Sequence, residues 1–452
     1  MRTFRLTLIV AASIASIASI ASGASGASAA ELPAVVHKPV VDVRAQPAFD
    51  APKVATLQRD TTVTVSAQQG LWYQLRMPAD TPGYVRVNDV RLAYAGVEDG
   101  AANVRVLMGG KAGQGRVTET AGVRGIEESD LKSAAFDRTQ LDGMVAQRVD
   151  GPAAAAYAGE RGWQATSVAY GGEARRGKSS GKATAESASS MAASAKSVGG
   201  LFGSLGGEVG SMLGGAAKAM PKAEDELAAE ELALGPEITG RILGARPLWA
   251  DADVQQRVNV VGRWVAAQTS RPDLPWTFGV IDTPEVNAFA APGGYILVTR
   301  GLYELLSSDS ELAAALAHEI THCVQRDHYN VIRKQEMANA GKEVAMSATD
   351  AGKDSLAGSY ARSYAEKHGA AIMLTSLDRK AEYRADEGAE YYLARAGMNP
   401  LALYSVLQKL TALGSDSAAL AELYKTHPPF DDRIDRIDER GFGALEPYTM
   451  RD

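Results

Sequence analysis

Three residues of one stretch, AAALAHEITHCVQRD, have the types and spacing of a metal-dependent hydrolytic centre. His318 and His322 are four residues apart, so on a helix their imidazoles lie one turn above each other and can bind one divalent cation. Glu319 follows His318 directly and can reach a water molecule bound to that cation. The chemistry indicated is zinc-assisted hydrolysis of a peptide bond, in which Glu319 takes a proton from the water and passes it to the leaving amine.

The helix that must carry these side chains has signals for its start and for its burial. Ser308 and Glu311 form a capping-box pair, and Leu312, Ala315 and Leu316 make an apolar stripe. Two histidines in so short a motif can also be ordinary surface residues. A buried helix with two imidazoles and a carboxylate loses stability unless these groups have partners, and a metal ion would supply one.

A third protein ligand must come from elsewhere in the chain, because a catalytic zinc has three protein ligands and one open position. The best candidate is Glu382, on a helix expected from about 378 to 395, with Asp386 one turn later on the same face. Asp386 could accept a hydrogen bond from the far nitrogen of a ligating histidine. Spacing alone fits equally well with two solvated helix acids. The other histidines are His328, which would face away on a continuing helix, His368 and His427.

A strand, a loop and a second strand are expected just before the motif helix. The strands are predicted at Thr277–Ile281 and Tyr295–Thr299, with a turn at 292–294. A strand beside a zinc-binding helix is a place where an extended peptide can pair through backbone hydrogen bonds. The segment 287–291 is the expected place, and the candidate substrate-binding residues are Asn287, Ala288 and Phe289.

Residues 31–95 read as short alternating strands with Pro-Gly and Gln-Gly turns. The stretches VDVRAQPAFDAPKVATL, GLWYQLRM and GYVRVNDVRL resemble a bacterial SH3 domain, which implies a small all-β barrel that binds cell-wall peptide or other peptides. A docking module without a ligand is an equal alternative. The aromatic residues Trp72, Tyr73 and Tyr84 either line a groove or belong to the core.

Composition and the N-terminus are typical of an exported protein. Residues 1–30 read as a signal peptide, with Arg2 and Arg5 ahead of an apolar stretch and small residues for cleavage; a retained membrane anchor is the alternative. The net charge of −7 does not favour binding to nucleic acid. We expect a periplasmic protein that is soluble or in peripheral contact with the membrane.

The remaining segments are assigned by composition. Residues 96–171 form a helical region without assigned chemistry, and 224–452 form the peptidase domain. Residues 172–223 are rich in Gly, Ala and Ser and are interpreted as a linker, or as an amphipathic segment that touches a membrane or covers the active site. The single cysteine, Cys323, excludes an intrachain disulfide and is expected to pack in the core, because on a helix it stacks over Glu319 and away from the histidines.

Four stretches in order, VNAFAAPGGYILVTRGL, ELAAALAHEITH, DRKAEYRAD and THPPFDDRIDRI, resemble the landmarks of the HtpX and BepA type of zinc metallopeptidase. The resemblance covers roughly residues 242–439 and implies a mainly α-helical (α+β) gluzincin domain. It implies one zinc ion per chain, held by His318, His322 and Glu382, with Glu319 as general base.

The same resemblance implies roles around the metal. Asp386 would orient a ligand, and His427 would lie near the zinc, where it either caps the metal at rest or stabilises the tetrahedral oxyanion. Arg433 would be a structural or positioning residue, or else a solvated helix arginine.

Three functional hypotheses follow. The first is a zinc endopeptidase of the envelope that cleaves misfolded or misassembled proteins. The second is a cell-wall or envelope binding protein that acts through its SH3-like domain, with a latent zinc domain. The third, compatible with the first, is cleavage of the chain's own linker between 172 and 223.

Overall fold

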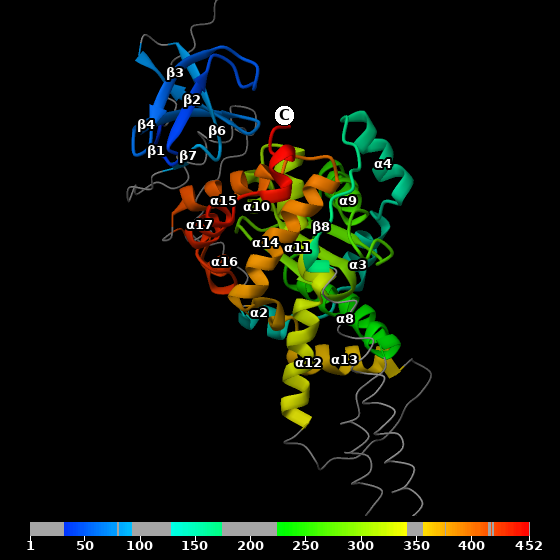
Figure 1. Ribbon diagram of the computed structural model, residues 1–452. Coiled ribbons are helices and arrows are strands. Elements are labelled where there is room, and N and C mark those ends of the chain that lie inside the picture. Colours follow the sequence, from blue (N-terminus) through cyan, green and yellow to red (C-terminus); the bar gives the residue numbers. More distant parts are fainter. Residues whose placement is uncertain are drawn as a thin grey trace, which may run out of the picture.

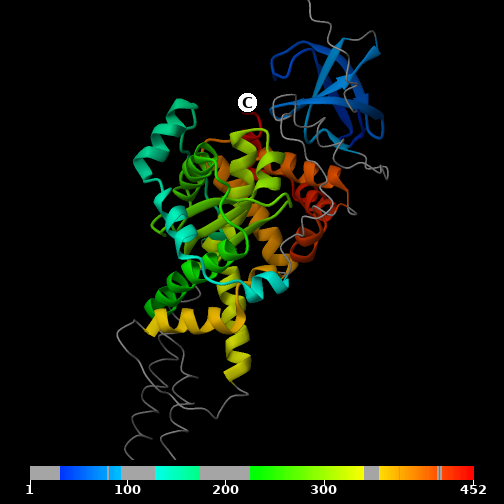
Figure 2. The same cartoon turned by 180° about the vertical axis from the view of Figure 1, so that it is seen from behind.

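The computed structural model describes residues 31–78, 81–92, 128–173, 224–340, 356–375, 377–414, 417 and 420–451. The predicted signal peptide and all but the first two residues of the predicted linker lie outside this part. A small all-β domain sits against one end of a larger helical body, as two opposite views show (Figures 1 and 2). The expected fold, an SH3-like module followed by a mainly helical domain with a small sheet, is confirmed.

The all-β domain is one antiparallel sheet with strand order β3-β2-β6-β5-β4-β1-β7. Alternate side chains, such as Val41 and Val43 of β2, point into its core, which explains the alternation in the sequence. Tyr73 is fully buried and Tyr84 half-buried. The strands are β1 Leu32–Val36, β2 Val40–Arg44, β3 Lys53–Gln58, β4 Thr62–Gln69, β5 Trp72–Arg76, β6 Pro82–Arg86 and β7 Val90–Leu92.

The helical body encloses a three-stranded sheet with order β8-β10-β9. Strand β10 (Tyr295–Thr299) pairs in parallel with β8 (Thr277–Ile281) and antiparallel with β9 (Ala288–Ala291), so β9 is an edge strand. The helices are α8 Glu224–Ala245, α9 Ala252–Ala266, α10 Arg300–Leu305, α11 Asp309–Gln325, α12 Asp327–Ala340, α13 Leu356–His368, α14 Arg379–Arg395, α15 Leu401–Leu413, α16 Ala421–Thr426 and α17 Phe430–Arg440. None of the described helices is long and apolar enough to cross a membrane.

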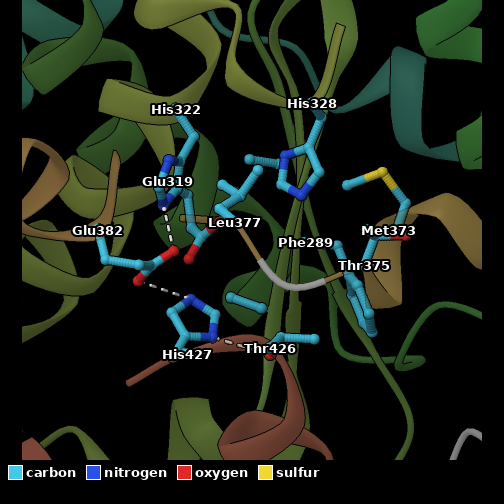
Figure 3. Close-up of a pocket in the computed structure, with 12 residues that line it drawn as sticks. Phe289, Glu319, His322, His328, Met373, Thr375, Leu377, Glu382, Thr426 and His427 are labelled. Atoms are coloured by element: carbon cyan, nitrogen blue, oxygen red, sulfur yellow. Dashed lines mark hydrogen bonds and ion pairs between the residues drawn. The ribbon is translucent and has the colours of Figure 1, made fainter. Parts of the chain in front are cut away.

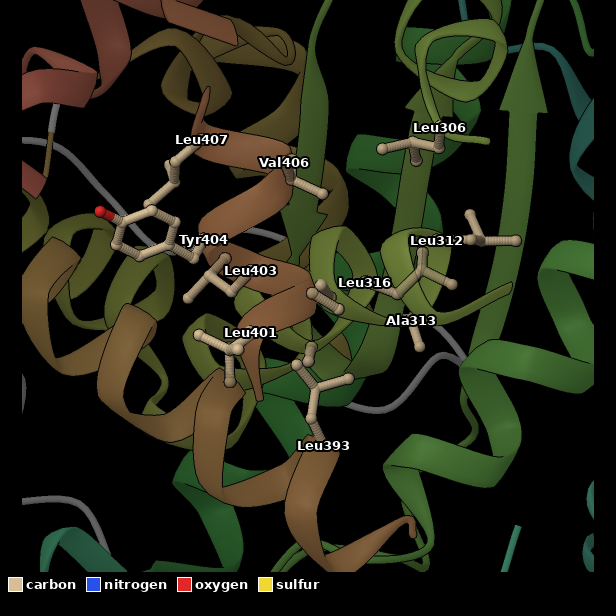
Figure 4. Close-up of a cluster of buried hydrophobic side chains, with 14 of the residues drawn as sticks. Leu306, Leu312, Ala313, Leu316, Leu393, Leu401, Leu403, Tyr404, Val406 and Leu407 are labelled. Carbon is tan, nitrogen blue, oxygen red and sulfur yellow. The ribbon is translucent and has the colours of Figure 1, made fainter. Parts of the chain in front are cut away.

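Helix α11, which carries the H-E-x-x-H motif, runs through the core of this body. It packs against α9, α14 and α15, and its Leu312 and Leu316 lie in an apolar cluster with Leu393 and Leu401 (Figure 4). Ser308 caps its first turn by accepting a hydrogen bond from the Glu311 amide. The buried apolar stripe fixes the rotation of the helix, and thereby the direction in which the histidines point.

The region that precedes the predicted linker also belongs to the helical body. Its helices are α2 (Glu128–Ser133), α3 (Arg138–Ala146) and α4 (Gly151–Glu160); α3 packs on α8 and α4 on α9. After α4 the chain runs beside α14, where the Tyr170 ring stacks on Tyr391 at 4.6 Å. The helices expected in this region are present, and their contacts are with the domain that carries the motif.

The all-β domain is docked on α15 and α17. The side chain of Gln408 in α15 accepts a hydrogen bond from the Leu92 amide and donates to the carbonyls of Val87 and Val90. Arg91 forms ion pairs with Asp435 and Asp438 of α17, at 2.7 and 2.6 Å. The contact is therefore made by specific polar side chains and does not rest on chain connectivity alone.

Candidate metal centre

Four side chains from three elements converge beside α11. His318 and His322 come from α11, Glu382 from the first turn of α14, and His427 from the residue after α16 (Figure 3). Their ligand atoms all lie within 4.8 Å of one another. Oε2 of Glu382 is 3.5 Å from His318 Nε2 and 3.7 Å from His427 Nε2, and Oε1 of Glu382 is 3.5 Å from His322 Nε2. Tetrahedral zinc with bonds of about 2 Å spaces its ligands roughly 3.3 Å apart, so the cluster is close to that size.

The buried negative charge of Glu382 indicates that this cluster can bind a cation. Its side chain is 1% exposed, and among the described residues neither carboxylate oxygen has a hydrogen-bond partner. Burial alone would raise the pKa of this carboxyl, but His427, His318 and His322 outweigh burial and hold the pKa well below its usual range. A buried carboxylate without hydrogen bonds is costly unless a cation compensates it. Two imidazoles and one carboxylate are a donor set that zinc accepts.

A buried carboxylate orients His318. Asp386, one turn after Glu382 on α14, lies 3.0 Å from His318 Nδ1. Arg433 of α17 donates to both oxygens of Asp386, at 2.9 and 2.6 Å. This contact directs His318 Nε2 to the cluster centre. Asp386 thus lies within hydrogen-bond distance of the far nitrogen of His318, as expected, and Arg433, at 4% exposure, is no solvated helix arginine.

A second carboxylate orients His322, and sequence reasoning missed it. Asp327 Oδ2 lies 3.0 Å from His322 Nδ1, so both motif histidines have an acidic partner on the far nitrogen. Helix α11 ends at Gln325, and Arg326 adopts a left-handed conformation with φ 57°, which folds the next residues back toward His322. The assumption of a continuing helix was wrong here, and no Gly, Asn or Pro marks the break.

The same break changes the position of His328. On a continuing helix it would face away, but its ring lies 6.0 Å from the His322 ring and lines the cleft beside the cluster. It is outside the group of four donors. His368 is also outside that group, and Cys323 is buried with its Sγ 3.4 Å from the Ala291 carbonyl, as expected for a packing residue.

Glu319 points into the cleft beside the donors (Figure 3). Its side chain is buried, and burial raises the pKa of this carboxyl although the two motif histidines oppose the rise. A carboxylate that is poorly solvated accepts a proton more readily than one in water. Glu319 therefore lies beside the donors as a buried carboxyl with a raised pKa.

The cleft itself is narrow, and apolar side chains line it beside the polar donors. Its volume is about 10 Å³, room for roughly one water molecule. Ala288 and Phe289 of β9 form one wall, and Met373 and Leu377 another. Asn287 does not line it: this residue is 2% exposed, and its side chain accepts a hydrogen bond from the Ala288 amide at 2.9 Å. The cleft in this conformation is too small for a peptide.

Comparison with known proteins agrees with this geometry. Residues 251–441 match the model of peptidase family M48, and residues 39–90 match that of a bacterial SH3 domain. The chain is 28% identical over 227 residues to a beta-barrel assembly-enhancing protease of Yersinia pestis, covering 48% of this chain and 45% of that protein. It is 27% identical over 166 residues to the metalloprotease LoiP of Escherichia coli, covering 37% and 63%.

A further relative is the mitochondrial metalloendopeptidase OMA1 of Arabidopsis thaliana, 31% identical over 163 residues, covering 36% of this chain and 31% of that protein. The chain thus spans less than half the length of the assembly-enhancing protease it matches. Both resemblances expected from the sequence are confirmed by these matches.

Proposed function

Because residues 251–441 are a peptidase family M48 domain and residues 39–90 a bacterial SH3 domain, we propose that the chain is a zinc-dependent endopeptidase of the bacterial cell envelope. Its substrates are misfolded or misassembled envelope proteins. The observation that carries the proposal is the convergence of four buried donors on one point, with Glu319 beside them in the same cleft. The names of the relatives, all proteases, support it.

His318, His322 and Glu382 would hold the zinc, one ion per chain. When bound, zinc polarises the scissile carbonyl and lowers the pKa of a water molecule. Glu319 takes the proton of that water and delivers it to the leaving amine, which its buried position beside the donors allows. Asp386 and Asp327 keep the two imidazoles in the tautomer that presents Nε2 to the metal.

His427 is proposed as a fourth group that alternates between two tasks. Burial, with the nearby charges of His318 and Arg433, lowers its pKa to about 3 against the opposing effect of Glu382, so the imidazole is neutral. A neutral imidazole near the other donors can occupy the fourth position at rest. Once displaced by substrate, the imidazole in its Nε2–H tautomer can donate a hydrogen bond to the oxyanion, while Nδ1 accepts one from the Thr426 hydroxyl at 2.8 Å.

Strand β9 is proposed to bind the substrate backbone. In the described part of the chain it pairs with β10 on one side and with no strand on the other. Its outer edge therefore offers amide and carbonyl groups to an extended peptide next to the cleft wall made by Ala288 and Phe289. Backbone pairing would tolerate many sequences, which suits an enzyme for misfolded proteins.

The cellular location and the binding partners are proposed on the same grounds. We expect export by the segment 1–30, a periplasmic location with at most peripheral membrane contact, protein substrates and no nucleic acid. Cell-wall peptide is a candidate ligand of the SH3-like domain. The alternative of a binding protein with a latent zinc domain is less favoured, because the donors and Glu319 are all in place.

The deciding experiment compares casein cleavage by the mature protein and its Glu319→Gln variant, with zinc measured in both. We expect about one zinc per chain in each, as for a single three-ligand site. We expect cleavage by the wild type alone, with a loss of about a hundredfold or more in the variant. Zinc removal by a chelator should abolish cleavage and zinc addition restore it. Zinc bound by both with cleavage by neither would contradict the proposal.

A further inference from the structure

A second cavity, of about 210 Å³, lies where the all-β domain meets the helical body. Phe49, Trp72 and Arg86 of the all-β domain form one side of it, and Asn399 and Arg451 of the helical body form the other. The Asn399 side chain donates hydrogen bonds to the carbonyls of Thr449 and Arg451 and so holds that wall in place. Neither domain makes this cavity alone.

Arg86 is held rigidly at the cavity wall. Its guanidinium lies 5.0 Å from the centre of the Phe49 ring, and Phe49 meets the Trp72 ring edge to face at 5.1 Å. Nη2 of Arg86 donates to the Thr449 carbonyl across the domain boundary. Since the side chain is already ordered by these contacts, binding a ligand would cost it little conformational entropy.

The two arginines of this cavity, Arg86 and Arg451, form no direct ion pair within the described part of the chain. Arg91, at the same domain boundary, pairs with Asp435 and Asp438. Burial lowers the pKa of Arg86, although Asp89 and Glu446 partly oppose this. Each guanidinium has five N–H donors in a fork that matches a carboxylate. An anion would therefore offset the desolvation of Arg86.

The size of the cavity and the aromatic wall restrict the ligand. A volume of about 210 Å³ is below that of most sites for drug-sized molecules, and it fits one terminal residue better than a chain that passes through. The rings of Phe49 and Trp72 offer an apolar surface next to the guanidinium. The net charge of −7 disfavours the binding of long polyanions.

We propose that this interdomain cavity binds the carboxyl-terminal residue of a peptide. The terminal carboxylate lies on the guanidinium group of Arg86, opposite the wall to which Arg451 belongs, and the side chain of that residue packs against Phe49 and Trp72. The site goes beyond the proposed peptidase function and does not depend on it. It would hold a polypeptide by its end on the same molecule that carries the metal centre.

The test is peptide binding to the full mature chain carrying Glu319→Gln, so that no probe is cut. The probes are three fluorescein-labelled hexapeptides: GGSGAF with a free carboxyl terminus, GGSGAF with an amidated terminus, and amidated GGSGAE, which has only a side-chain carboxylate. Fluorescence anisotropy gives each dissociation constant. The variants are Arg86→Gln and, as matched control, Arg59→Gln, an exposed arginine of the same domain outside the cavity wall.

We expect the free-carboxylate peptide to bind about tenfold or more tightly than either amidated peptide, because a charge-assisted hydrogen bond is lost in both. Arg86→Gln should weaken binding of the free-carboxylate peptide by a similar factor, and Arg86→Lys should weaken it less. Arg59→Gln should leave this binding unchanged. Thermal unfolding of each variant checks that the domains remain folded.

Equal binding of the acid and amide forms, or no binding of any probe, would overturn the proposal. So would tighter binding of the side-chain carboxylate, or full competition by inorganic phosphate at equal concentration, since either would make the cavity a general anion site. Because the readout is binding to a chain with Glu319 replaced, these outcomes are separate from success or failure of proteolysis.

Discussion

A buried cluster with one central carboxylate lies toward each end of helix α11, around Glu311 of α11 itself and around Glu382 of α14, and the two clusters differ in their hydrogen bonds. At the first turn, Glu311 accepts hydrogen bonds from Lys409 at 2.7 Å, Ser405 at 2.7 Å and Gln68 of the all-β domain at 3.0 Å. Near the last turns, Glu382 approaches the motif histidines with both oxygens unpartnered among the described residues. Both carboxylates are 1% exposed.

The difference indicates what each cluster is for. A buried carboxylate with all its hydrogen bonds made stabilises the fold and has no capacity left for a ligand. A buried carboxylate that faces imidazole nitrogens and lacks hydrogen bonds is costly, and a bound cation would offset that cost. We therefore expect substitutions at the first cluster to change folding, and substitutions at the second to change zinc binding.

The largest effect is expected from Glu382→Gln. This change keeps the shape of the side chain and removes the negative charge, so zinc content should fall well below one per chain and casein cleavage by more than about a hundredfold. Glu387→Gln, on the same helix and outside the donor group, is the matched control. Zinc by mass spectrometry and cleavage rates give the readout, and full zinc with normal turnover would remove Glu382 from the site.

The opposite pattern is expected from Lys409→Met. It leaves Glu311 buried without its ion-pair partner, which typically costs about 3–5 kcal/mol in the free energy of unfolding. Urea unfolding of metal-free and zinc-loaded protein measures this cost. The folded fraction should still bind about one zinc per chain. A loss of zinc at full folding would show that the two clusters are coupled and would break the distinction drawn above.

A pH titration should separate the clusters further. In the metal-free fold the pKa of His318 is raised to about 9: burial and Arg433 lower it, but the neighbouring carboxylates of Asp386 and Glu382 outweigh them. The pKa of a histidine in the unfolded chain is about 6.5, so His318 binds its proton more tightly in the folded state. This stabilises the fold fully below pH 6.5, and the contribution is lost as pH rises through about 9.

Metal-free stability should therefore fall by up to about 3 kcal/mol between pH 6.5 and 9, whereas stabilisation by added zinc should grow, because zinc needs neutral imidazoles. Lys409 and its hydrogen-bonding neighbours lower the pKa of Glu311 against burial, so that cluster should titrate only in acid. Urea unfolding at several pH values, with and without zinc, measures both trends. A metal-free stability that rises over this window would contradict the assignment of His318.

The smallest effect is expected from Asp327→Asn. This substitution weakens the orientation of His322 and should lower zinc affinity by about 10- to 100-fold, with little change in the free energy of unfolding.

Asp386→Asn should lower zinc affinity similarly and also destabilise the fold, because Arg433 would lose its buried partner. Competition with a zinc chelator gives both affinities. Unchanged affinity in Asp327→Asn would mean that packing alone orients His322.

The sequence by itself determined the parts of this protein that depend on local pattern. Alternation predicted the strands of the all-β domain, and the cap and apolar stripe predicted the helix that carries His318, Glu319 and His322. Glu382 and Asp386 were assigned by family resemblance, since their spacing fits a solvated pair equally well. Residue type and helical periodicity are properties of a short segment, which is why they can be read without the fold.

Only the tertiary structure decided the rest. The turn at Arg326, which brings Asp327 to His322 and His328 to the cleft, has no residue that marks it, and it is held by long-range contacts such as the ion pair between Arg326 and Glu231. The docking of the all-β domain through Gln408 joins residues more than 300 positions apart. Contacts of this kind depend on how whole elements pack, and no local periodicity encodes them.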